Sequence, residues 1–401
     1  MTESATHALA LNAGSSSLKF SLYRLLDGEE EHEVFSGSVS NIGEGAGTAR
    51  LSVPGSKTHL TIESMADACN VAFDWIISQQ HAVDVVGHRV VHGGPAIVSP
   101  QLINQELIEV LKSLSKYAPE HLPPVLKCFA LAKVAFPGVP HCACFDTAFH
   151  SSIPPVASTY ALPEVHRAHG IRKFGFHGLS YEYLLSSLCQ ELGQEHVRAL
   201  KIVFLHLGHG ASLAAVSNGV SIDTTMGFTP CGGFPMSSRL GDIDPEVVLY
   251  LLDNEGVAPA ELKALLNKKC GLIAFSDKGN DFRALDKAAH VQDDPSAVFA
   301  HTYFIYHLAK HVAAMVSALG GLDCLVFSAG VGENSSFVRE RLCARLAYLG
   351  VELDEEQNSS KSAESRIISA AQSRVVVRVI PTNEEVVIAR ASVAILKALV
   401  A

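Results

Sequence analysis

The chain has 401 residues, of which 48% are hydrophobic and 18% are charged, so it can bury large cores in two or three domains and is not a disordered protein. Its 31 lysines and arginines against 41 aspartates and glutamates give a formal net charge of −10. That balance, with no basic run to offset it, argues against nucleic acid and against an anionic membrane as partners.

The sequence predicts a cytoplasmic protein. No lysine or arginine precedes the first apolar stretch, so we expect no signal peptide. The most apolar later stretch, 312–331, is broken by Gly320, Gly321 and Asp323, which predicts a helix end and a buried strand rather than a membrane span. The nine cysteines form no CxxC pair and indicate reduced thiols.

Apolar β-like runs alternate with helical segments in the first half, which predicts α/β architecture. Residues 8–25 predict a strand, a Gly/Ser turn and a returning strand, and 83–91 predict a further strand. Helical spacing covers 101–117 and 121–135. The run HCACFDTAF (141–149) closes this half as a buried strand.

Pro154-Pro155 predicts a linker or hinge, after which the second half begins like the first. Residues 201–220 again predict a strand, a glycine turn and a returning strand. A helix is expected at 245–266 and a longer one at 296–319, followed by a buried strand that runs into a glycine turn at 322–334. The chain ends in a predicted strand, turn and helix, capped by Thr382 or Asn383.

The two hairpins resemble each other. LNAGSSSLKFSL and LHLGHGASLAAV share an apolar strand, a Gly-x-x-Ser-type turn and a returning strand, and Gly14 and Gly208 stand 194 residues apart. This spacing of about one domain length favours an internal duplication over a chance likeness of two β-hairpins.

Three glycine turns follow apolar strands, at 12–17, 208–212 and 330–334. Glycine lets backbone N–H groups approach an anion, serine adds donors, and Lys19 on the exit strand could reach the same anion. None of the turns fits the P-loop or the dinucleotide-binding fingerprint. One such turn is usually only a hairpin, but three at strand ends in two similar halves favour nucleotide binding.

Charged side chains also stand within or at the ends of apolar runs. Arg89 lies inside VVGHRVVHGG, Asp146 ends a strand, His177 lies in FGFHGLS, and Arg239 begins RLGDIDP. A buried arginine is equally consistent with a structural carboxylate pair and with an anion ligand. A basic, an acidic and an imidazole group at strand ends are typical of α/β active sites.

These residues resemble the acetate and propionate kinase family. The matching stretches are LNAGSSSLK (11–19), GHRVVHGG (87–94), FDTAFH (145–150), FGFHGLS (174–180), HLGHGAS (206–212), MGFTP with RLGDIDP (226–245), SAGVGEN (328–334) and PTNEE (381–385). They follow in the family's order over the whole chain.

The resemblance implies an α/β fold of two duplicated actin-like (ribonuclease H-like) domains flanking a nucleotide cleft. The N-terminal domain would be 1–150, with the C-terminal helix 385–401 packing back on it, and the C-terminal domain 151–384. It also implies reversible transfer of a phosphoryl group from ATP to a short-chain carboxylate, acetate above all, and a homodimer.

The resemblance further implies roles for single residues. Asn12 and Glu384 would support Mg²⁺ (or Mn²⁺). Arg89 and Arg239 would clamp the carboxylate and the phosphoryl group, while His177 would donate to that group in the transition state. Asp146 would orient substrate or metal. The other matching positions are His121 in the active site, Val91, Phe176 and Pro230 with Arg89 around the substrate, and Ser15, Ser17, Lys19, His206, Leu207, Gly208, His209, Gly210, Asp281, Phe282, Arg283, Gly330, Val331, Gly332, Glu333 and Asn334 around ATP or ADP.

The chemistry suits these residue types. A carboxylic acid with a pKa near ~4.3 is ionised at neutral pH, so no strong general base is needed. Nucleophile and phosphoryl oxygens are all anionic, so their repulsion has to be neutralised before in-line attack. Direct transfer without a phosphoenzyme is therefore the predicted mechanism.

Departures from the family pattern bear on nucleotide and substrate choice. His209 replaces an amide in the phosphate turn HLGHG, and Leu179 and Tyr181 replace a threonine and a histidine. Glu120 replaces a leucine expected beside the substrate's methyl group, and Leu122 replaces an asparagine. A glutamate beside an apolar tail is unfavourable unless it turns away or pairs. The alternatives are a propionate or other short-chain acyl kinase, a non-catalytic nucleotide-binding protein of the same superfamily, and a kinase acting on a hydroxyl group.

Overall fold

The computed structural model describes residues 5–14, 16–26, 31–43, 45, 47–115, 117–362 and 364–400. The chain divides into two units, the first comprising Met1–Phe149 with Asn383–Ala401 and the second His150–Thr382. The boundaries thus lie one or two residues before the domain limits expected from the sequence. Among the described residues, no helix is both long and apolar enough to cross a membrane.

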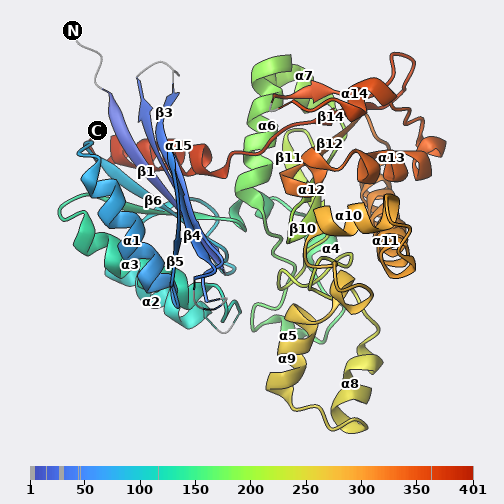
Figure 1. Cartoon of the computed structure of the whole chain (residues 1–401), viewed down its shortest axis with the longest axis horizontal. Coiled ribbons are helices and arrows are strands. Elements are labelled where there is room, and N and C mark those ends of the chain that lie inside the picture. The colour runs from blue at the N-terminus through green and yellow to red at the C-terminus, as the bar shows by residue number, and fades with distance from the viewer. Residues whose placement is uncertain are drawn as a thin grey trace. The chain divides into compact units, whose positions relative to one another are not determined.

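The first unit is a mixed sheet with helices on both faces (Figure 1). Its elements are β1 (Thr6–Ala13), β2 (Ser17–Leu25), β3 (Glu31–Ser40), β4 (Ala49–Val53), β5 (Ser56–Leu60), α1 (Met65–Ser78), β6 (Val85–Val90), β7 (Gln101–Leu102), α2 (Gln105–Leu114), α3 (Leu122–Ala135), β8 (His141–Phe145) and α15 (Glu384–Val400). The strand order is β5-β4-β3-β2-β1-β6-β8-β7. β1 pairs antiparallel with β2 and parallel with β6, and β6 pairs parallel with β8.

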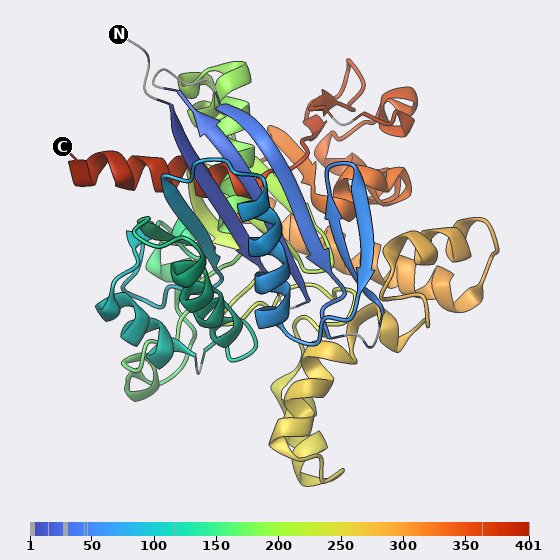
Figure 2. The same ribbon diagram turned by 60° about the vertical axis from the view of Figure 1, so that its left-hand side comes forward.

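Helices α1 and α3 cover one face of this sheet and α15 covers the other (Figures 1 and 2). The core between the sheet and α1 and α3 contains Leu9, Phe20, Phe73 and Phe129, each at most 3% exposed. Gly87 of β6 lets α15 lie close to the sheet, because a Cβ built there would lie 2.3 Å from Ser392 Oγ. The glycine of GHRVV is therefore a packing requirement of α15.

The second unit repeats this plan. Its elements are α4 (Pro155–Ser158), α5 (Glu164–Arg167), α6 (Gly178–Leu192), α7 (Gln194–Ala199), β9 (Ile202–Leu207), β10 (Ala211–Ser217), β11 (Val220–Thr224), α8 (Pro245–Asp253), α9 (Pro259–Lys268), α10 (Phe282–His290), α11 (Pro295–Leu319), β12 (Cys324–Ser328), α12 (Ala329–Asn334), α13 (Ser336–Arg345), α14 (Glu355–Ser359), β13 (Arg366–Ile367) and β14 (Val376–Val379).

The strand order of the second sheet is β11-β10-β9-β12-β14-β13. It matches the order β3-β2-β1-β6-β8-β7 within the first sheet. The directions also match, because β9 pairs antiparallel with β10 and parallel with β12, and β12 pairs parallel with β14. Shared order and direction in two sheets of one chain are what an internal duplication produces. The expected fold class of two duplicated α/β units is confirmed.

Three sequence predictions need correction. The helix expected at 245–266 is two helices, α8 and α9, because Gly256 takes a left-handed conformation (φ 67°) and Pro259 starts a new helix. The helix expected at 101–117 spans only Gln105–Leu114, after the short strand β7. The turn expected at 330–334 is the short helix α12, which Ala329 opens with φ 63°.

Candidate active site

In the first unit, four predicted site residues meet at the carboxyl ends of the parallel strands. Asn12 lies near the end of β1, Arg89 near the end of β6 and Asp146 directly after β8, while Glu384 opens α15. Ligand sites of α/β sheets form where the carboxyl ends of parallel strands meet. The fold therefore gathers residues that stand up to 372 positions apart in the sequence.

Arg89 is held by a two-pronged contact with Asp146. Its Nε donates to Asp146 Oδ1 at 2.9 Å and its Nη2 to Oδ2 at 2.6 Å, while Nη1 donates to Asn12 Oδ1 at 3.0 Å. Asp146 is 1% exposed and the Arg89 side chain 16%. Burial acts to lower the pKa of Arg89, but the carboxylates of Asp146 and Glu384 outweigh it and hold this pKa above its ordinary value.

Asn12 links the arginine to two acidic residues of α15. Its Nδ2 donates to Glu384 Oε2 and to Glu385 Oε1, both at 2.9 Å, and Glu384 Oε2 lies 3.8 Å from Arg89 Nη1. Arg89 and its partner Asn12 therefore contact three carboxylates between them, an excess of two negative charges over the one guanidinium. Carboxylate and amide oxygens with that charge fit a hard divalent cation such as Mg²⁺. Glu385 was not singled out from the sequence, where it reads only as a first-turn acidic residue.

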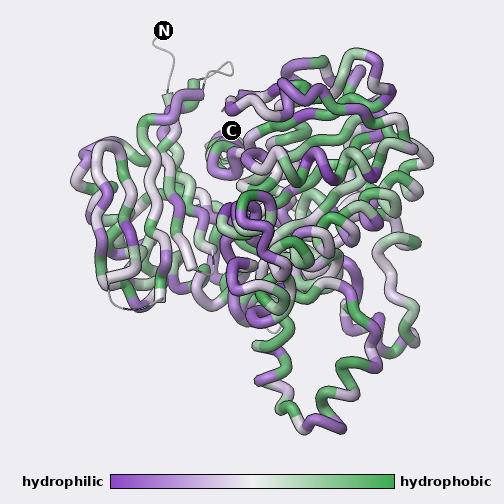
Figure 3. Tube along the Cα trace, turned by 45° about the vertical axis from the view of Figure 1, so that its right-hand side comes forward, coloured by the Kyte–Doolittle hydropathy of each residue, from purple (hydrophilic) through white to green (hydrophobic). Residues whose placement is uncertain are grey.

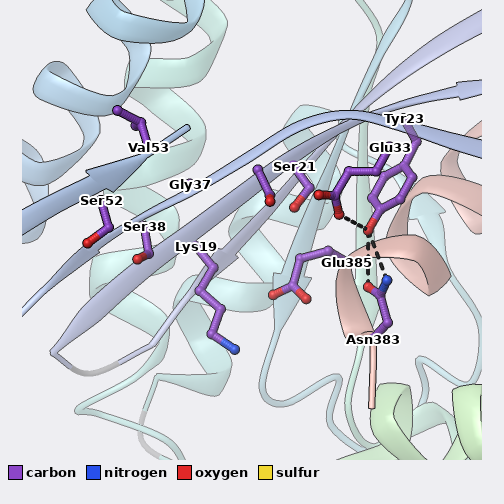
Figure 4. Close-up of a pocket in the computed structure, with 11 residues that line it drawn as sticks. Lys19, Ser21, Tyr23, Glu33, Gly37, Ser38, Ser52, Val53, Asn383 and Glu385 are labelled. Atoms are coloured by element: carbon purple, nitrogen blue, oxygen red, sulfur yellow. Dashed lines mark hydrogen bonds between the residues drawn. The ribbon is translucent and has the colours of Figure 1, made fainter. Parts of the chain in front are cut away.

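The start of α15 is held in place by a contact with Tyr23 of strand β2 (Figure 4). Asn383 accepts a hydrogen bond from Val386 N at 3.1 Å and so caps the helix, and its side chain also contacts Tyr23 Oη at 3.1 Å. Tyr23 Oη in turn contacts Glu33 Oε2 at 3.1 Å. Burial raises the pKa of Tyr23, so the phenol keeps its proton and remains a donor. Sequence reasoning missed Tyr23, because its position in the strand gives no sign of contacts with Glu33 and Asn383.

His177 is the central imidazole of the second unit. It precedes α6 in a left-handed conformation (φ 60°), and Gly175 before it also has positive φ. Its Nδ1 lies 2.8 Å from Ser212 Oγ, which lies 2.5 Å from Tyr181 Oη. Burial raises the pKa of Tyr181 and keeps it protonated, so one arrangement that satisfies this chain has Tyr181 donating to Ser212 and Ser212 donating to Nδ1. The proton of His177 then resides on Nε2.

Two donors flank Gly210. A Cβ built on this glycine would lie 3.4 Å from His177 Nε2 and 3.1 Å from Arg239 Nη1. Arg239 Nη1 also donates to the carbonyl of Pro230 at 3.0 Å. The structure thus brings His177, Arg239 and the carbonyl of Pro230 to the turn between β9 and β10. Donors aimed at one small region suit an oxyanion.

His206 stacks on His177, with ring centroids 4.1 Å apart and planes at 18°. Its Nδ1 lies 2.8 Å from Ser180 Oγ, which contacts Thr382 Oγ1 at 2.9 Å. Thr382 N donates to Glu333 Oε1 at 3.1 Å. This polar path orients His206 and Glu333, so Ser180 and Thr382 are supporting residues that spacing alone could not identify.

Eight of the residues predicted to hold nucleotide come from three separate segments that line one cavity of the second unit. Its volume is about 560 Å³, and its walls are Gly208, His209, Ser237, Asn280, Asp281, Phe282, Arg283, Asp286, Gly330, Val331, Asn334 and Ser335. Asp281 Oδ1 caps α10 by accepting from Arg283 N at 3.0 Å. Pockets of about 300–1,000 Å³ accommodate small-molecule ligands.

Arg339 holds helix α12, which contributes residues to the cavity lining, in place. It is 2% exposed, and its Nη1 donates to the carbonyls of Gly332 and Glu333, each at 2.9 Å. Burial lowers its pKa to about 10, with help from Arg366. Within the described contacts its Nε binds Asn358 Oδ1 at 2.8 Å rather than a carboxylate. Nothing in the sequence marked this arginine as buried.

The remaining predicted residues fall into two groups. Lys19 pairs with Asn12 across the β1–β2 hairpin and is exposed, and Ser17 begins β2, whereas Ser15 lies outside the described residues. His121 is the residue before α3, Val91 follows β6 at 4% exposure, Phe176 is 1% exposed, and Leu207 ends β9. Their parts in the site stay predictions.

Comparison with known proteins adds the family. The sequence profile of the acetokinase family matches residues 7–390. The chain belongs to the acetokinase family. It is 40% identical over 393 residues to acetate kinase of Clostridium kluyveri, covering 95% of this chain and 96% of that one. It is 41% identical to acetate kinase of Corynebacterium efficiens over 394 residues, covering 96% and 98%.

Solved structures agree with this family. The crystal structure of Porphyromonas gingivalis acetate kinase matches with a TM-score of 0.85 at 33% identity, covering 98% of this chain and 100% of that chain. That of a propionate kinase from Francisella tularensis matches with a TM-score of 0.88 at 34% identity, covering 97% and 99%. This member of the acetokinase family is therefore a kinase, and the expected family and enzyme class are confirmed.

Proposed function

We propose that this acetokinase transfers the γ-phosphoryl group of ATP to acetate, giving acetyl phosphate and ADP in a reversible reaction. The observation that carries the proposal is the guanidinium of Arg89, fixed on two sides by Asp146 and Asn12. Three of its five N–H groups are used there, which leaves one on Nη1 and one on Nη2, with Glu384 Oε2 lying 3.8 Å from Nη1. A planar guanidinium fork matches a carboxylate better than any other side chain does.

Asp146 orients Arg89 and does not act as a base that removes a proton. Both of its oxygens accept hydrogen bonds from Arg89, and acetate at neutral pH brings no proton that needs removal. The residue therefore locks the arginine in the plane in which substrate meets it. Direct in-line transfer follows, because no side chain of this cluster has to carry the phosphoryl group.

Arg239 supplies positive charge, and both Arg239 and His177 supply N–H donors for the phosphoryl oxygens. The assigned proton on Nε2 and the guanidinium face the same turn around Gly210. Both groups are held before substrate arrives, His177 by Ser212 and Arg239 by the Pro230 carbonyl. Preorganised donors of this kind lower the barrier by about 3–4 kcal/mol each.

Asn12, Glu384 and Glu385 are the residues that would hold Mg²⁺, or Mn²⁺, beside Arg89. When bound, such an ion neutralises phosphate charge and shields the attacking carboxylate from it. ATP would occupy the cavity formed by the segments around Gly208, Asp281 and Gly330. His209 is itself one of the residues that line this cavity.

The test is acyl phosphate formation, trapped with hydroxylamine, from ATP and Mg²⁺ with acetate, propionate or butyrate. We expect acetate-dependent product and a loss of about 10²–10³-fold in turnover for Arg239→Ala. If propionate is the better substrate, the proposed substrate changes from acetate to propionate but the reaction type stays the same. One methylene in an apolar pocket changes specificity by only about 10–200-fold. Nucleotide binding without product from any acid would favour the non-catalytic alternative.

A homodimer and a cytoplasmic location complete the proposal. Helix α8 has no buried residue, and Val247, Leu249 and Tyr250 on it are 42%, 47% and 55% exposed. Hydrophobic stretches continue into this α8–α9 hairpin at the foot of the view in Figure 3. Exposed apolar side chains of this size favour a protein partner. Light scattering of wild type and Tyr250→Lys tests whether α8 mediates self-association.

All nine cysteines are free thiols, which supports a reducing compartment.

A further inference from the structure

A second cluster of metal-binding side chains lies behind the nucleotide cavity, on α10 and α11. Asp286 and His290 stand one turn apart on α10, and His301 faces them from α11. His301 Nε2 lies 3.1 Å from Asp286 Oδ1 and 3.5 Å from His290 Nε2. One atom of each side chain lies within 4.8 Å of the other two. None of the three belongs to the reaction described above.

The spacing of these atoms matches a tetrahedral metal centre. Ligands about 2.0–2.1 Å from a tetrahedral zinc ion stand about 3.3 Å from one another, between the two distances found here. The nitrogen–nitrogen contact of 3.5 Å is longer than a normal hydrogen bond. The two contacts of His301 Nε2 thus have the spacing of ligands on one ion, and the remaining spacing, between Asp286 and His290, is within 4.8 Å.

The side chains are also held in place without an ion. The His290 ring stacks on Phe337, with centroids 4.1 Å apart and planes at 15°, and the His301 side chain is 4% exposed. Ser335 Oγ donates to Asp286 Oδ2 at 2.5 Å, which leaves Oδ1 directed at the histidines. A hydrogen bond to the outer oxygen of a carboxylate is how proteins orient a metal ligand.

Asp286 Oδ1 supplies a second observation. It is shielded from solvent, and among the described residues it accepts no hydrogen bond of good geometry, although His301 Nε2 lies 3.1 Å away. A buried carboxylate oxygen without such a partner is costly, and a bound ion is one of the few remedies. The alternative remedy is a proton on His301 Nε2, which would make the cluster an Asp–His–His relay with no metal.

We propose that Asp286, His290 and His301 bind a divalent transition-metal ion of the zinc class, with the fourth position open. Imidazole nitrogens select zinc-class ions over Mg²⁺, so this site differs in chemistry from the oxygen cluster around Asn12. Asp286 and Ser335 line the 560 Å³ cavity, which gives the ion a path from solvent. The ion ties α10 to α11 beside the residues proposed to hold nucleotide, but the site does not depend on that function.

The test uses the full chain, freed of metal with a chelator and titrated with Co²⁺ in buffer without Mg²⁺ or nucleotide. We expect about one equivalent of Co²⁺ with the intense visible bands of tetrahedral coordination, displaced by Zn²⁺. His290→Ala, which removes a half-buried ligand, should weaken binding by at least about 100-fold. His307→Ala, a half-buried histidine of α11 outside the cluster, is the matched control and should leave binding unchanged.

A thermal measurement gives an independent readout, because an ion that binds only the folded state raises Tm. Zn²⁺ should raise the Tm of wild type and of His307→Ala but not that of His290→Ala. Circular dichroism of each variant checks folding, and Asp286→Asn provides a second ligand substitution. Weak Co²⁺ bands in wild type, or bands equal in His290→Ala, would overturn the site and leave the hydrogen-bonded relay. Acyl phosphate formation is measured separately and can succeed or fail without affecting this result.

Discussion

At the scale of single residues, Arg89 shows how geometry can matter beyond charge. Arg89→Lys keeps the positive charge but cannot make the two parallel bonds to Asp146 together with the bond to Asn12. We expect kcat/KM for acetate to fall by about 10²–10³-fold, measured by hydroxylamine trapping. Arg198→Lys, at an exposed pair with Glu195, is the control and should change neither kcat nor KM. Equal activity of Arg89→Lys and wild type would remove the fork from the mechanism.

Ser212 tests the assignment of the His177 proton. Ser212→Ala takes away the partner of Nδ1, so the ring loses its fixed tautomer and we expect kcat to fall by about 10–100-fold. A double-mutant cycle with His177→Ala separates this role from a general structural one. If serine acts through histidine, Ser212→Ala should cost little more once His177 is gone. Additive losses would show that Ser212 acts elsewhere.

At the scale of elements, one tyrosine on β2 positions the helix that carries Glu384 and Glu385. Tyr23→Phe removes the hydroxyl that joins Glu33 to the cap residue Asn383. We expect a loss of about 1–2 kcal/mol in the free energy of unfolding, the usual cost of losing a buried hydrogen bond or a cap, and a higher Mg²⁺ concentration for half-maximal rate. Urea denaturation and a Mg²⁺ titration measure the two effects.

Tyr348→Phe, a change at a side chain that is 69% exposed, controls for the loss of a phenol. It should alter neither stability nor the Mg²⁺ requirement. A Tyr23→Phe protein that loses stability yet keeps the Mg²⁺ requirement of wild type would separate the cap from the metal residues. That result would leave Tyr23 as a packing residue only.

Local sequence signals predicted the elements whose boundaries depend on local chemistry. Helix α8 begins at Pro245, the first residue of the helix expected at 245–266, and Asn383 caps α15 as one of the two expected residues. The signals failed where a break depends on backbone conformation, as at Gly256 and Ala329, whose positive φ values no periodicity encodes. The hydrophobic periodicity of a sequence is judged over several residues, so it can extend an expected helix across a single residue with positive φ.

At the scale of the whole molecule, motifs in their family order predicted the duplicated fold and the residues that gather at strand ends. They could not predict the supporting contacts. Arg339, Thr382 and Tyr23 act through partners from 6 to 360 positions away, and such pairs are created by the fold alone. The Asp286 cluster is a further example, since His301 reaches it only because α11 packs on α10.

Buried histidines in both units predict how the protein responds to acid. Burial lowers the pKa of His92 and of His141 in the first unit, and of His150 in the second, from 6.5 to about 4. Unfolded chains bind these protons from about pH 6.5 downward while the native state stays neutral. The contribution of these neutral histidines to the free energy of unfolding is therefore fully present above pH 6.5. It is lost as the pH falls toward 4, by up to about 1.4 kcal/mol per pH unit for each histidine.

Measurement of Tm between pH 8 and pH 5 checks this expectation, since most carboxylates titrate below that window. Tm should be flat to about pH 7 and then fall. His150→Gln can keep the contacts that His150 makes with Ser221 Oγ and the Phe176 carbonyl but does not titrate, so its Tm should fall less steeply in acid. A constant Tm down to pH 5 in wild type would mean that the native structure accepts these protons, and the buried rings would then have to be paired as cations.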